Sequence, residues 1–503
     1  MVTSALAHKN DYPNAKPAIR IADLPHDDVK WCTVSLSDVI NANKRLEATV
    51  YDVEGKRARE VVESCKWESV PLYGTDGLSS AYTCGRFKRI WLESSDLPIY
   101  QPSSILDINP SPDGFMSHKT KANFDALRVH KGQILLTCSG TVGKVALVSD
   151  TLDNKIFSHD LIRMDVKNPE DIGFVYAFLR SKIGSTILQT NSYGAVIQHI
   201  EPEHLSEIPV PNPDSGIKVR INDLILRSFE LRDKSNKLID EATALLKVEL
   251  KLPPITEFET KRFDNRIDIN NYNVKLSQLS GRLDGSYHVP VVSAITEHLQ
   301  KYAAEVTTVG NERISESIIL PGRFKRVYVD EGQGRVFFGG KQLYELDPSN
   351  KKYLSVSKHS ARINAELEIS ENTILITRSG TVGKVNISPK HWEHWIASDH
   401  IIRVFPTCEA VAGYLYIFLA SDYGRSLITR FTYGSVVDEI DARHVSQIPF
   451  PLLKNSGIQA EINRLALEAN SMRYEAYQFE QEAMQVMNDE VLFADRGRHD
   501  GKL

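Results

Sequence analysis

The sequence predicts an α+β protein with two mixed, β-rich globular units that are separated by two long antiparallel coiled-coil helices and related by a pseudo-twofold internal repeat. Three observations support this fold class. Short motifs occur twice in the same order, each copy contains β-type runs broken by glycine turns, and each copy ends in a segment with apolar residues every seven positions. A chain of 503 residues is long enough for roughly two to four domains.

The internal repeat is defined by motifs that recur in order along the chain. Gly85–Arg89 returns at Gly322–Arg326, and Ser139–Val145 returns at Ser379–Val385. Further pairs are Ser158–Arg163 with Ser398–Arg403, Tyr193–Ile197 with Tyr433–Val437, Ile208–Pro211 with Ile448–Pro451, and Arg45–Glu47 with Arg282–Asp284. Ordered matches of this kind indicate a duplicated unit.

Each copy begins with short strands and closes with prolines. The run Gly132–Thr137, the following glycine turn and the run Val145–Val148 predict a hairpin-like pair of strands. Short helical stretches are expected over 172–189 and 411–430. The Ile-Pro-x-Pro segments then end the globular part of each copy, because prolines with this spacing disfavour a continuing helix or a central strand.

A long helix is predicted after each Ile-Pro-x-Pro segment, because large apolar residues recur there every seven positions. They are Ile217, Leu224, Leu231, Leu238 and Leu245 in the first helix, and Ile458, Leu465, Met472, Phe479 and Val486 in the second. The alternate seam positions hold Ile221, Ser228, Ser235 and Ala242, and Ile462, Ala469, Ala476 and Ala483. Small residues at one seam position allow close approach, so we expect the two helices to pair with each other. About 35 residues at about 1.5 Å each give a spacer of roughly 50 Å.

These elements define the predicted domain boundaries. An N-terminal tail (1–30) is followed by globular unit 31–213, spacer helix 214–252, linker 253–272, globular unit 273–454, spacer helix 455–492 and a C-terminal tail (493–503). Pro253 and Pro254 end the first helix. If the helices pair antiparallel, the two units are held apart and inverted, which suits a ligand with local twofold symmetry such as duplex DNA.

Composition restricts the classes of function. The chain has 60 Lys and Arg against 65 Asp and Glu, and a net charge of −5 argues against a generally basic nucleic-acid binder, so DNA contacts must use local charge. Basic stretches at 118–144 and 351–362 fit either DNA-facing loops or ordinary solvated faces.

The N-terminus lacks the apolar region of a signal peptide, so we expect a cytoplasmic protein. Five scattered cysteines without a C-x-x-C pair indicate neither a disulfide framework nor a metal site.

The duplicated order of globular region, Ile-Pro-x-Pro turn and long heptad helix resembles the specificity subunits of Type I restriction-modification systems. The strand, Ser-Gly-Thr-Val-Gly-Lys turn and strand, and the later Tyr-Gly-x-Val segment, share this resemblance, which covers about Trp31 to Val491. It implies that each unit is a target-recognition domain for one half of a bipartite DNA target. It also implies two modification (methyltransferase) subunits that carry S-adenosylmethionine, and restriction (translocase or nuclease) subunits, as partners, with no cofactor bound by this chain.

Candidate DNA-binding residues fall into two groups. The glycine turns could present hydroxyl, amide and lysine groups to phosphates, or could be tight structural turns only. The stretches 101–128 and 339–362 align poorly between the copies, as expected of side chains that read two different half-sites, although solvated loop charges would look the same. The full set is Arg86, Lys88, Lys119, Lys121, Arg128, Ser139, Thr141, Lys144, Tyr193, Arg323, Lys325, Lys341, Lys352, Lys358, Arg362, Ser379, Thr381, Lys384 and Tyr433.

Motifs for catalysis by this chain are weak, so we expect a recognition subunit and not an enzyme. The turn Gly140–Lys144 has two residues between its glycines, where a phosphate-binding P-loop has four. Ser158–Asp160 has the composition of a hydrolase triad, but the second copy swaps the order of His and Asp. Two alternatives remain, namely a specificity or adaptor subunit of a related phage-defence methylation system, and an enzyme with its site in the unaligned loops.

Overall fold

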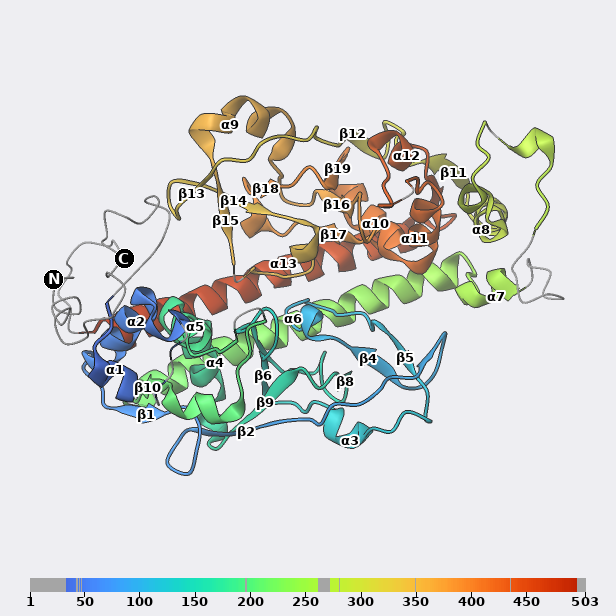
Figure 1. The fold of residues 1–503 in the computed structure, drawn as a ribbon. Coiled ribbons are helices and arrows are strands. Elements are labelled where there is room, and N and C mark those ends of the chain that lie inside the picture. Colours follow the sequence, from blue (N-terminus) through green and yellow to red (C-terminus); the bar gives the residue numbers. More distant parts are fainter. Residues whose placement is uncertain are drawn as a thin grey trace, which may run out of the picture. The chain divides into compact units, whose positions relative to one another are not determined.

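The computed structural model describes residues 33–494 except 42, 43, 45, 47, 195, 196, 261–271, 280, 349 and 435 (Figure 1). The predicted N-terminal tail, the repeat residues Arg45 and Glu47 and most of the linker therefore lie outside the described residues. The described chain divides into two compact units. Unit 1 takes in residues up to 105, 111–226 and from 481 onward, and unit 2 takes in 106–110 and 227–480.

Unit 1 combines short strands with helices, as the predicted mixed α and β class requires. Its helices are α1 (Leu36–Asn41), α2 (Val53–Glu63), α3 (Phe124–Leu127), α4 (Ile172–Arg180), α5 (Lys182–Thr190) and the beginning of α6 (Ser215–Glu249). Its strands are β1 (Ser69–Pro71), β2 (Ser79–Thr83), β3 (Trp91–Leu92), β4 (Pro98–Tyr100), β5 (Gly114–Met116), β6 (Ile134–Thr137), β7 (Val145–Leu147), β8 (Ile156–Phe157), β9 (Leu161–Val166) and β10 (Pro209–Pro211).

Unit 2 has the same kinds of element. Its helices are α7 (Ile255–Thr260), α8 (Pro290–Tyr302), α9 (Val356–Arg362), α10 (Glu409–Ala420), α11 (Asp422–Thr429), α12 (Ala442–Ser446) and most of α13 (Ser456–Val486). Its strands are β11 (Glu305–Thr308), β12 (Ser315–Ile319), β13 (Tyr328–Val329), β14 (Gly334–Phe338), β15 (Lys352–Ser355), β16 (Ile374–Thr377), β17 (Val385–Ile387), β18 (Ile396–Ala397), β19 (Ile401–Pro406) and β20 (Pro449–Leu452). The start of the predicted linker is thus helical, because α7 follows directly after Pro253 and Pro254.

The two units have the same strand order in each of their sheets. The orders are β1-β10, β2-β9-β6-β7 and β3-β5-β4-β8 in unit 1, and β11-β20, β12-β19-β16-β17 and β13-β15-β14-β18 in unit 2. Only the pairs β4·β8 and β14·β18 are parallel among these described strands. The Ile-Pro-x-Pro segments form β10 and β20, each in a two-stranded sheet where prolines do not interrupt a larger ladder.

The predicted hairpin around the glycine turn is confirmed. Strands β6 and β7 pair antiparallel, with Ile134 opposite Leu147, and β16 and β17 pair in the same way. Gly140 and Gly143 have φ of 73° and 92°, in the left-handed region that favours glycine, and the second copy repeats this with 74° at Gly380 and 83° at Gly383. Local backbone geometry therefore explains the recurring glycines.

The helical stretches expected over 172–189 and 411–430 are each two helices. Ser181 ends α4 by donating its hydroxyl to the Phe178 carbonyl at 2.6 Å, and it caps α5 by accepting from the Gly184 amide at 3.0 Å. Ser421 makes the same two bonds between α10 and α11. A Cβ atom at Gly184 would lie 2.0 Å from the Phe178 carbonyl oxygen, so the tight connection requires glycine there. Helix α4 packs on β7, and α10 packs on β16, β17 and β19, so both helices cover their sheets.

Within unit 2, α6 and α13 run antiparallel. The Ser228 hydroxyl donates to the Ala476 carbonyl at 2.7 Å, and farther along α6 Arg473 reaches Ser235. Their closest packing uses the small seam residues. The small seam residues are fully or almost fully buried, namely Ser228, Ser235, Ala242, Ala469 and Ala476. Among the large heptad residues of this unit, only Leu231 and Leu465 are buried. The others are half-buried, namely Leu238, Leu245, Ile458, Met472 and Phe479. In unit 1, Ile221 and Ala483 are buried while Ile217, Leu224 and Val486 are half-buried. None of the described helices is both long and apolar enough to cross a membrane.

Candidate nucleic-acid interface

In unit 1, several repeated motifs meet at one pocket of about 640 Å³. Arg86 comes from the segment after β2, Ser139 from the turn after β6, and Tyr193 from the loop after α5. Residues His159 and Asp160, just before β9, also line the pocket. The structure therefore brings together three candidate residues that are far apart in the sequence.

The unit 1 pocket combines an exposed guanidinium with hydroxyl, thiol and imidazole groups and with the carboxylates of Asp160, Glu201 and Glu203. The Tyr193 hydroxyl donates to Glu201 Oε1 at 2.6 Å, and this hydrogen bond raises the pKa of Tyr193 to about 12. Burial lowers the pKa of His159, whose ring packs edge-on against Phe87 with centroids 5.6 Å apart. Burial likewise raises the pKa of the Cys138 thiol to about 11. Arg86 therefore lies among uncharged hydrogen-bonding groups and carboxylates, so its positive charge is balanced inside the pocket.

The glycine turns are held by a threonine in each unit. Thr137 donates its hydroxyl to the Thr141 carbonyl at 2.6 Å and accepts from the Lys144 amide at 3.0 Å. Thr377 makes the equivalent bonds to Thr381 and Lys384. The threonines at the tips, Thr141 and Thr381, are exposed, whereas both lysines are half-buried. The turn thus presents its hydroxyl to solvent on a rigid base.

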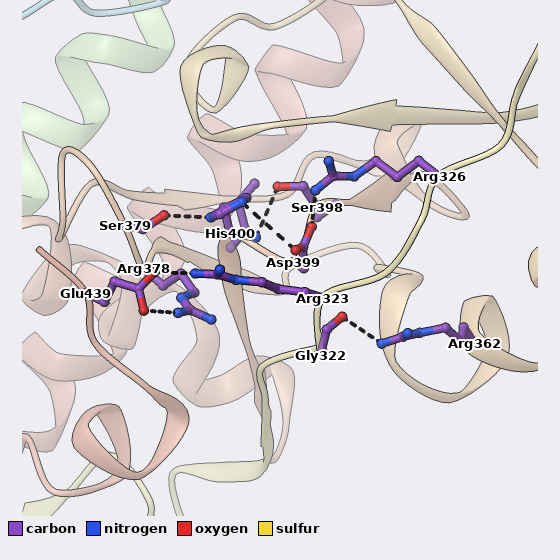
Figure 2. Close-up of polar contacts among 12 residues, drawn as sticks. Gly322, Arg323, Arg326, Arg362, Arg378, Ser379, Ser398, Asp399, His400 and Glu439 are labelled. Carbon is purple, nitrogen blue, oxygen red and sulfur yellow. Dashed lines mark hydrogen bonds and ion pairs between the residues drawn. The ribbon is translucent and has the colours of Figure 1, made fainter. Parts of the chain in front are cut away.

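In unit 2, the corresponding motifs are joined by ion pairs, as Figure 2 shows. Arg323 donates to Glu439 Oε1 at 2.9 Å, and Arg378 pairs with the other carboxylate oxygen. The Ser379 hydroxyl lies 2.7 Å from His400 Nδ1. Sequence reasoning identified Arg323 and Ser379 but missed Arg378 and Glu439, because their pairing joins positions that no local pattern connects.

A buried arginine supports the site in each unit. Arg163 on β9 is fully buried and donates to the carbonyls of Leu127 and Phe157 at 3.1 Å each. Arg403 on β19 is also fully buried, and it donates to the Leu367 carbonyl at 3.1 Å and the Ser398 carbonyl at 3.0 Å. Burial lowers the pKa of both guanidinium groups. The sequence carried a signal for them, since an arginine follows two aliphatic residues at the same place in both copies.

The other candidates do not gather at these sites. Lys88, Lys119, Lys121, Lys325, Lys341 and Lys358 are exposed, and none of those in unit 1 lines the pocket. Three others already make contacts inside their own unit. Arg128 donates to the Asn154 carbonyl at 2.8 Å, Arg362 donates to the Gly322 carbonyl at 2.7 Å, and the Lys352 ammonium lies 5.3 Å from the centre of the Tyr328 ring.

The Ser-His-Asp segments do not form matching triads. In unit 1, Ser158 is fully buried and the His159 ring lies 3.3 Å from Asp160, its neighbour in sequence. In unit 2, the His400 ring contacts Ser379 through Nδ1 and lies 4.0 Å from Asp399 through Nε2, and Asp399 also pairs with Arg326. Ser398 meets His400 through the His400 backbone amide, which donates to the Ser398 hydroxyl at 3.3 Å. These contacts favour the structural interpretation, because a serine hydroxyl meets the histidine ring in unit 2, whereas Nδ1 of His159 in unit 1 has no hydrogen-bond partner among the described residues.

Comparison with known proteins identifies part of the chain. Residues 88–255 match the family model of the Type I restriction modification DNA specificity domain. The chain therefore carries a Type I restriction-modification DNA specificity domain. The match confirms the resemblance over these residues, which run from the end of the Gly85–Arg89 motif through β10 and α6.

Solved structures that are weakly similar to this chain are described as S or HsdS subunits. A Type I restriction-modification system S subunit from M. genitalium is 15% identical, with a TM-score of 0.27 over 84% of this chain and 98% of that chain. An HsdS subunit from Thermoanaerobacter tengcongensis is 12% identical, with a TM-score of 0.25 over 84% of this chain and 98% of that one. No curated protein matches the chain. The assignment of the specificity domain therefore rests on the family model and on the motifs.

Proposed function

We propose that this chain is the sequence-specific DNA-binding specificity subunit of a Type I restriction-modification enzyme. Each unit would be a target-recognition domain that reads one half of an asymmetric, bipartite target. One observation carries the proposal. The matched specificity domain includes most of one copy of a repeat, and the second copy has the same strand order and builds a site from the same motifs. The predicted limits 31–213 and 273–454 are our proposed limits for the two recognition domains.

The chemistry of both sites supports contact with a nucleic acid. An exposed arginine, a serine and a tyrosine come together beside a turn whose threonine hydroxyl faces solvent. Arginine and lysine bind phosphates and guanine edges, and hydroxyl groups contact phosphates, so both affinity and sequence preference can arise from such a surface. The overall charge of −5 is compatible with this function, because single exposed arginines, Arg86 and Arg323, can make the contacts in sites that also hold carboxylates.

Partner subunits complete the proposed enzyme. Helices α6 and α13 would serve as spacers that dock two modification subunits, which bind S-adenosylmethionine and transfer the methyl group. This chain would contribute recognition and no catalytic residue, and restriction subunits would add translocation and cleavage. Defence against phage is the biological role that we infer for the assembly.

Methylation by the reconstituted complex tests the proposal. The full chain, co-expressed with its modification subunit, should transfer tritium from S-adenosylmethionine to DNA at an interrupted, asymmetric site, whereas either protein alone should not. Sequencing of the methylated positions gives the target. Transfer by this chain alone would contradict the non-catalytic role, and a complex that methylates without any base preference would favour an adaptor function.

A further inference from the structure

We propose that Arg323 reads a guanine in the half-site bound by unit 2, and that Glu439, held by Arg378, positions Arg323 for this contact. The inference deepens the proposed function and rests on it. It assigns a specificity-determining residue and its positioning residue to one of the two sites, from the ion-pair arrangement shown in Figure 2.

The arrangement has a fixed end and a free end. Arg378 and Glu439 have side chains that are 11% and 18% exposed, and they form an ion pair. The Arg323 side chain is 70% exposed and is tied to the same carboxylate by one nitrogen, at 2.9 Å. The other donors of its guanidinium therefore face solvent while the carboxylate restrains the group.

The backbone holds Glu439 in place as well. Its amide donates to the Tyr433 carbonyl at 2.8 Å, and its carbonyl accepts from the Tyr433 amide at 3.0 Å. The next residue, Ile440, donates its amide to the Arg378 carbonyl at 2.9 Å. The carboxylate is thus fixed from both its backbone and its side chain, as a positioning group needs to be.

The chemistry of a restrained arginine favours guanine. A planar guanidinium can donate two parallel hydrogen bonds to O6 and N7 of guanine in the major groove, and this pairing is the commonest specific contact to a base edge. A carboxylate that takes one nitrogen leaves a second edge of the fork free and reduces the entropy lost on binding. A flexible arginine on the same surface would serve a phosphate equally well, so the restraint is the feature that indicates base recognition.

Unit 1 lacks this restraint at the equivalent place. Ser139 and Tyr193 form the same isolated backbone bridges to His199 that Ser379 and Tyr433 form to Glu439, so His199 occupies the position of Glu439. The repeat places Cys138 at the position of Arg378. Arg86, the counterpart of Arg323, therefore has no carboxylate from this position, and the two units are expected to use the shared arginine differently.

The test compares base preference in the two half-sites. The full chain with its modification subunit binds a duplex library in which both half-sites are randomised, and the bound fraction is sequenced. Arg323→Lys keeps the charge but loses the planar fork, so preference for guanine should fall roughly 5- to 150-fold at one position of the unit 2 half-site. Glu439→Gln should lower preference at that same position by a smaller factor. The half-site of unit 1 should remain unchanged in both variants.

A matched control uses another exposed ion pair of unit 2. Arg313 pairs with Glu305 through an exposed guanidinium, and Arg313→Lys and Glu305→Gln repeat the same chemical changes away from the site. Neither should alter base preference at any position. The double variant Arg378→Cys/Glu439→His gives unit 2 the residues of unit 1, and it should reproduce the loss seen with Glu439→Gln.

The outcomes separate this inference from the proposed function. If the unaltered complex shows no preference in either half-site, the proposed function fails. If it shows a bipartite preference and Arg323→Lys weakens all sequences equally, Arg323 is a phosphate contact and the inference is overturned. If Arg323→Lys lowers the preference for guanine but Glu439→Gln leaves it intact, the role of Glu439 is structural and the positioning assignment is overturned. Melting temperatures close to that of the unaltered chain would establish that the variants are folded.

Discussion

The two units share a scaffold and differ in the side chains that line their sites. Buried Arg163 and Arg403 occupy the same position, and their terminal guanidinium nitrogens donate to backbone carbonyls in both units. The site positions differ, since Cys138 and His199 in unit 1 correspond to Arg378 and Glu439 in unit 2. The residues that both units keep are those that hold the fold, and the residues that differ are those that would change if each unit reads a different sequence, as proposed.

A second difference lies away from the sites. In unit 2, His391 stacks on Tyr477 with ring centroids 3.9 Å apart and an angle of 8°, and Trp392 is buried beside it. The repeat places Thr151 at the position of His391 in unit 1. Unit 2 therefore has an ionisable group in an aromatic cluster that unit 1 lacks, so acid should affect the two units differently.

The largest effect is expected when the second copy of the repeat is removed. In a fragment of residues 1–252, the apolar residues of α6 lose α13, and leaving each in water costs roughly 1.5–3 kcal/mol relative to burial. The fragment should therefore pair with a second copy of itself. A modification complex built on it should methylate an interrupted palindrome made of the unit 1 half-site and its inverted copy.

Sedimentation and methylation-site sequencing check this expectation. A monomeric fragment would show that the helices are not held together by the seam described above. A target that still contains the unit 2 half-sequence would show that the units do not read separate half-sites.

The shared buried arginines should have the next largest effect. Arg163→Met or Arg403→Met leaves buried carbonyls without donors, and each variant should lose about 2–5 kcal/mol of unfolding free energy in its own unit. Calorimetry of the full chain should show one unit melting earlier while the other is unchanged. Arg313→Met, at an exposed arginine, is the control and should change stability by less than about 0.5 kcal/mol. If both arginine variants melt like the unaltered chain, the scaffold does not depend on them.

Acid should then distinguish unit 2 from unit 1. Burial lowers the pKa of His391 to about 4, and its ring nitrogen Nε2 lies 2.9 Å from the Leu346 carbonyl. In the unfolded chain, His391 takes up its proton near the ordinary histidine pKa of 6.5. The folding stability that neutral His391 contributes is therefore present above pH 6.5 and is lost as the pH falls toward 4. The loss should reach about 2–3 kcal/mol.

Urea unfolding at several pH values, followed by tryptophan fluorescence, measures this loss. His391→Phe should flatten the pH dependence between pH 6.5 and 4, because phenylalanine takes up no proton. His130→Gln, at an exposed histidine of unit 1, is the control and should leave it unchanged. An unaltered slope in His391→Phe would assign the acid sensitivity of unit 2 to other groups.

Local patterns predicted the scaffold better than the site. The hairpins follow from glycine spacing, and the long helices follow from heptads, since both depend on neighbours in sequence. The sequence did not predict that Ser181 and Ser421 each divide a helical stretch into two helices, because each serine caps the next helix only once the chain has turned. The pair Arg378–Glu439 depends on contact between distant segments, and no single-sequence pattern reports such a contact.

The predicted heptads also show where pattern and packing differ. The heptad pattern predicted a seam of large apolar residues, but residues such as Leu238 and Met472 are only half-buried. The helices instead approach through Ser228 and Ala476, whose small side chains permit a hydrogen bond from hydroxyl to backbone. Close approach of two backbones is governed by the smallest residues at the seam, so the largest residues come to flank it.

The smallest effect is expected at the lysines of the glycine turns, where the two units should behave alike. If each lysine neutralises one phosphate without reading a base, as proposed, Lys144→Ala and Lys384→Ala should each reduce the slope of log affinity against log salt by about 0.9. Base preference in both half-sites should stay the same.

Lys384 gives the sharper test, because its ammonium lies 5.2 Å from the centre of the Tyr344 ring. Tyr344→Leu should therefore weaken binding through the same lysine. Binding titrations at several salt concentrations measure both quantities. An unchanged slope in all three variants would make the turns structural in both units, and a change in only one lysine variant would extend the difference between the units to their phosphate contacts.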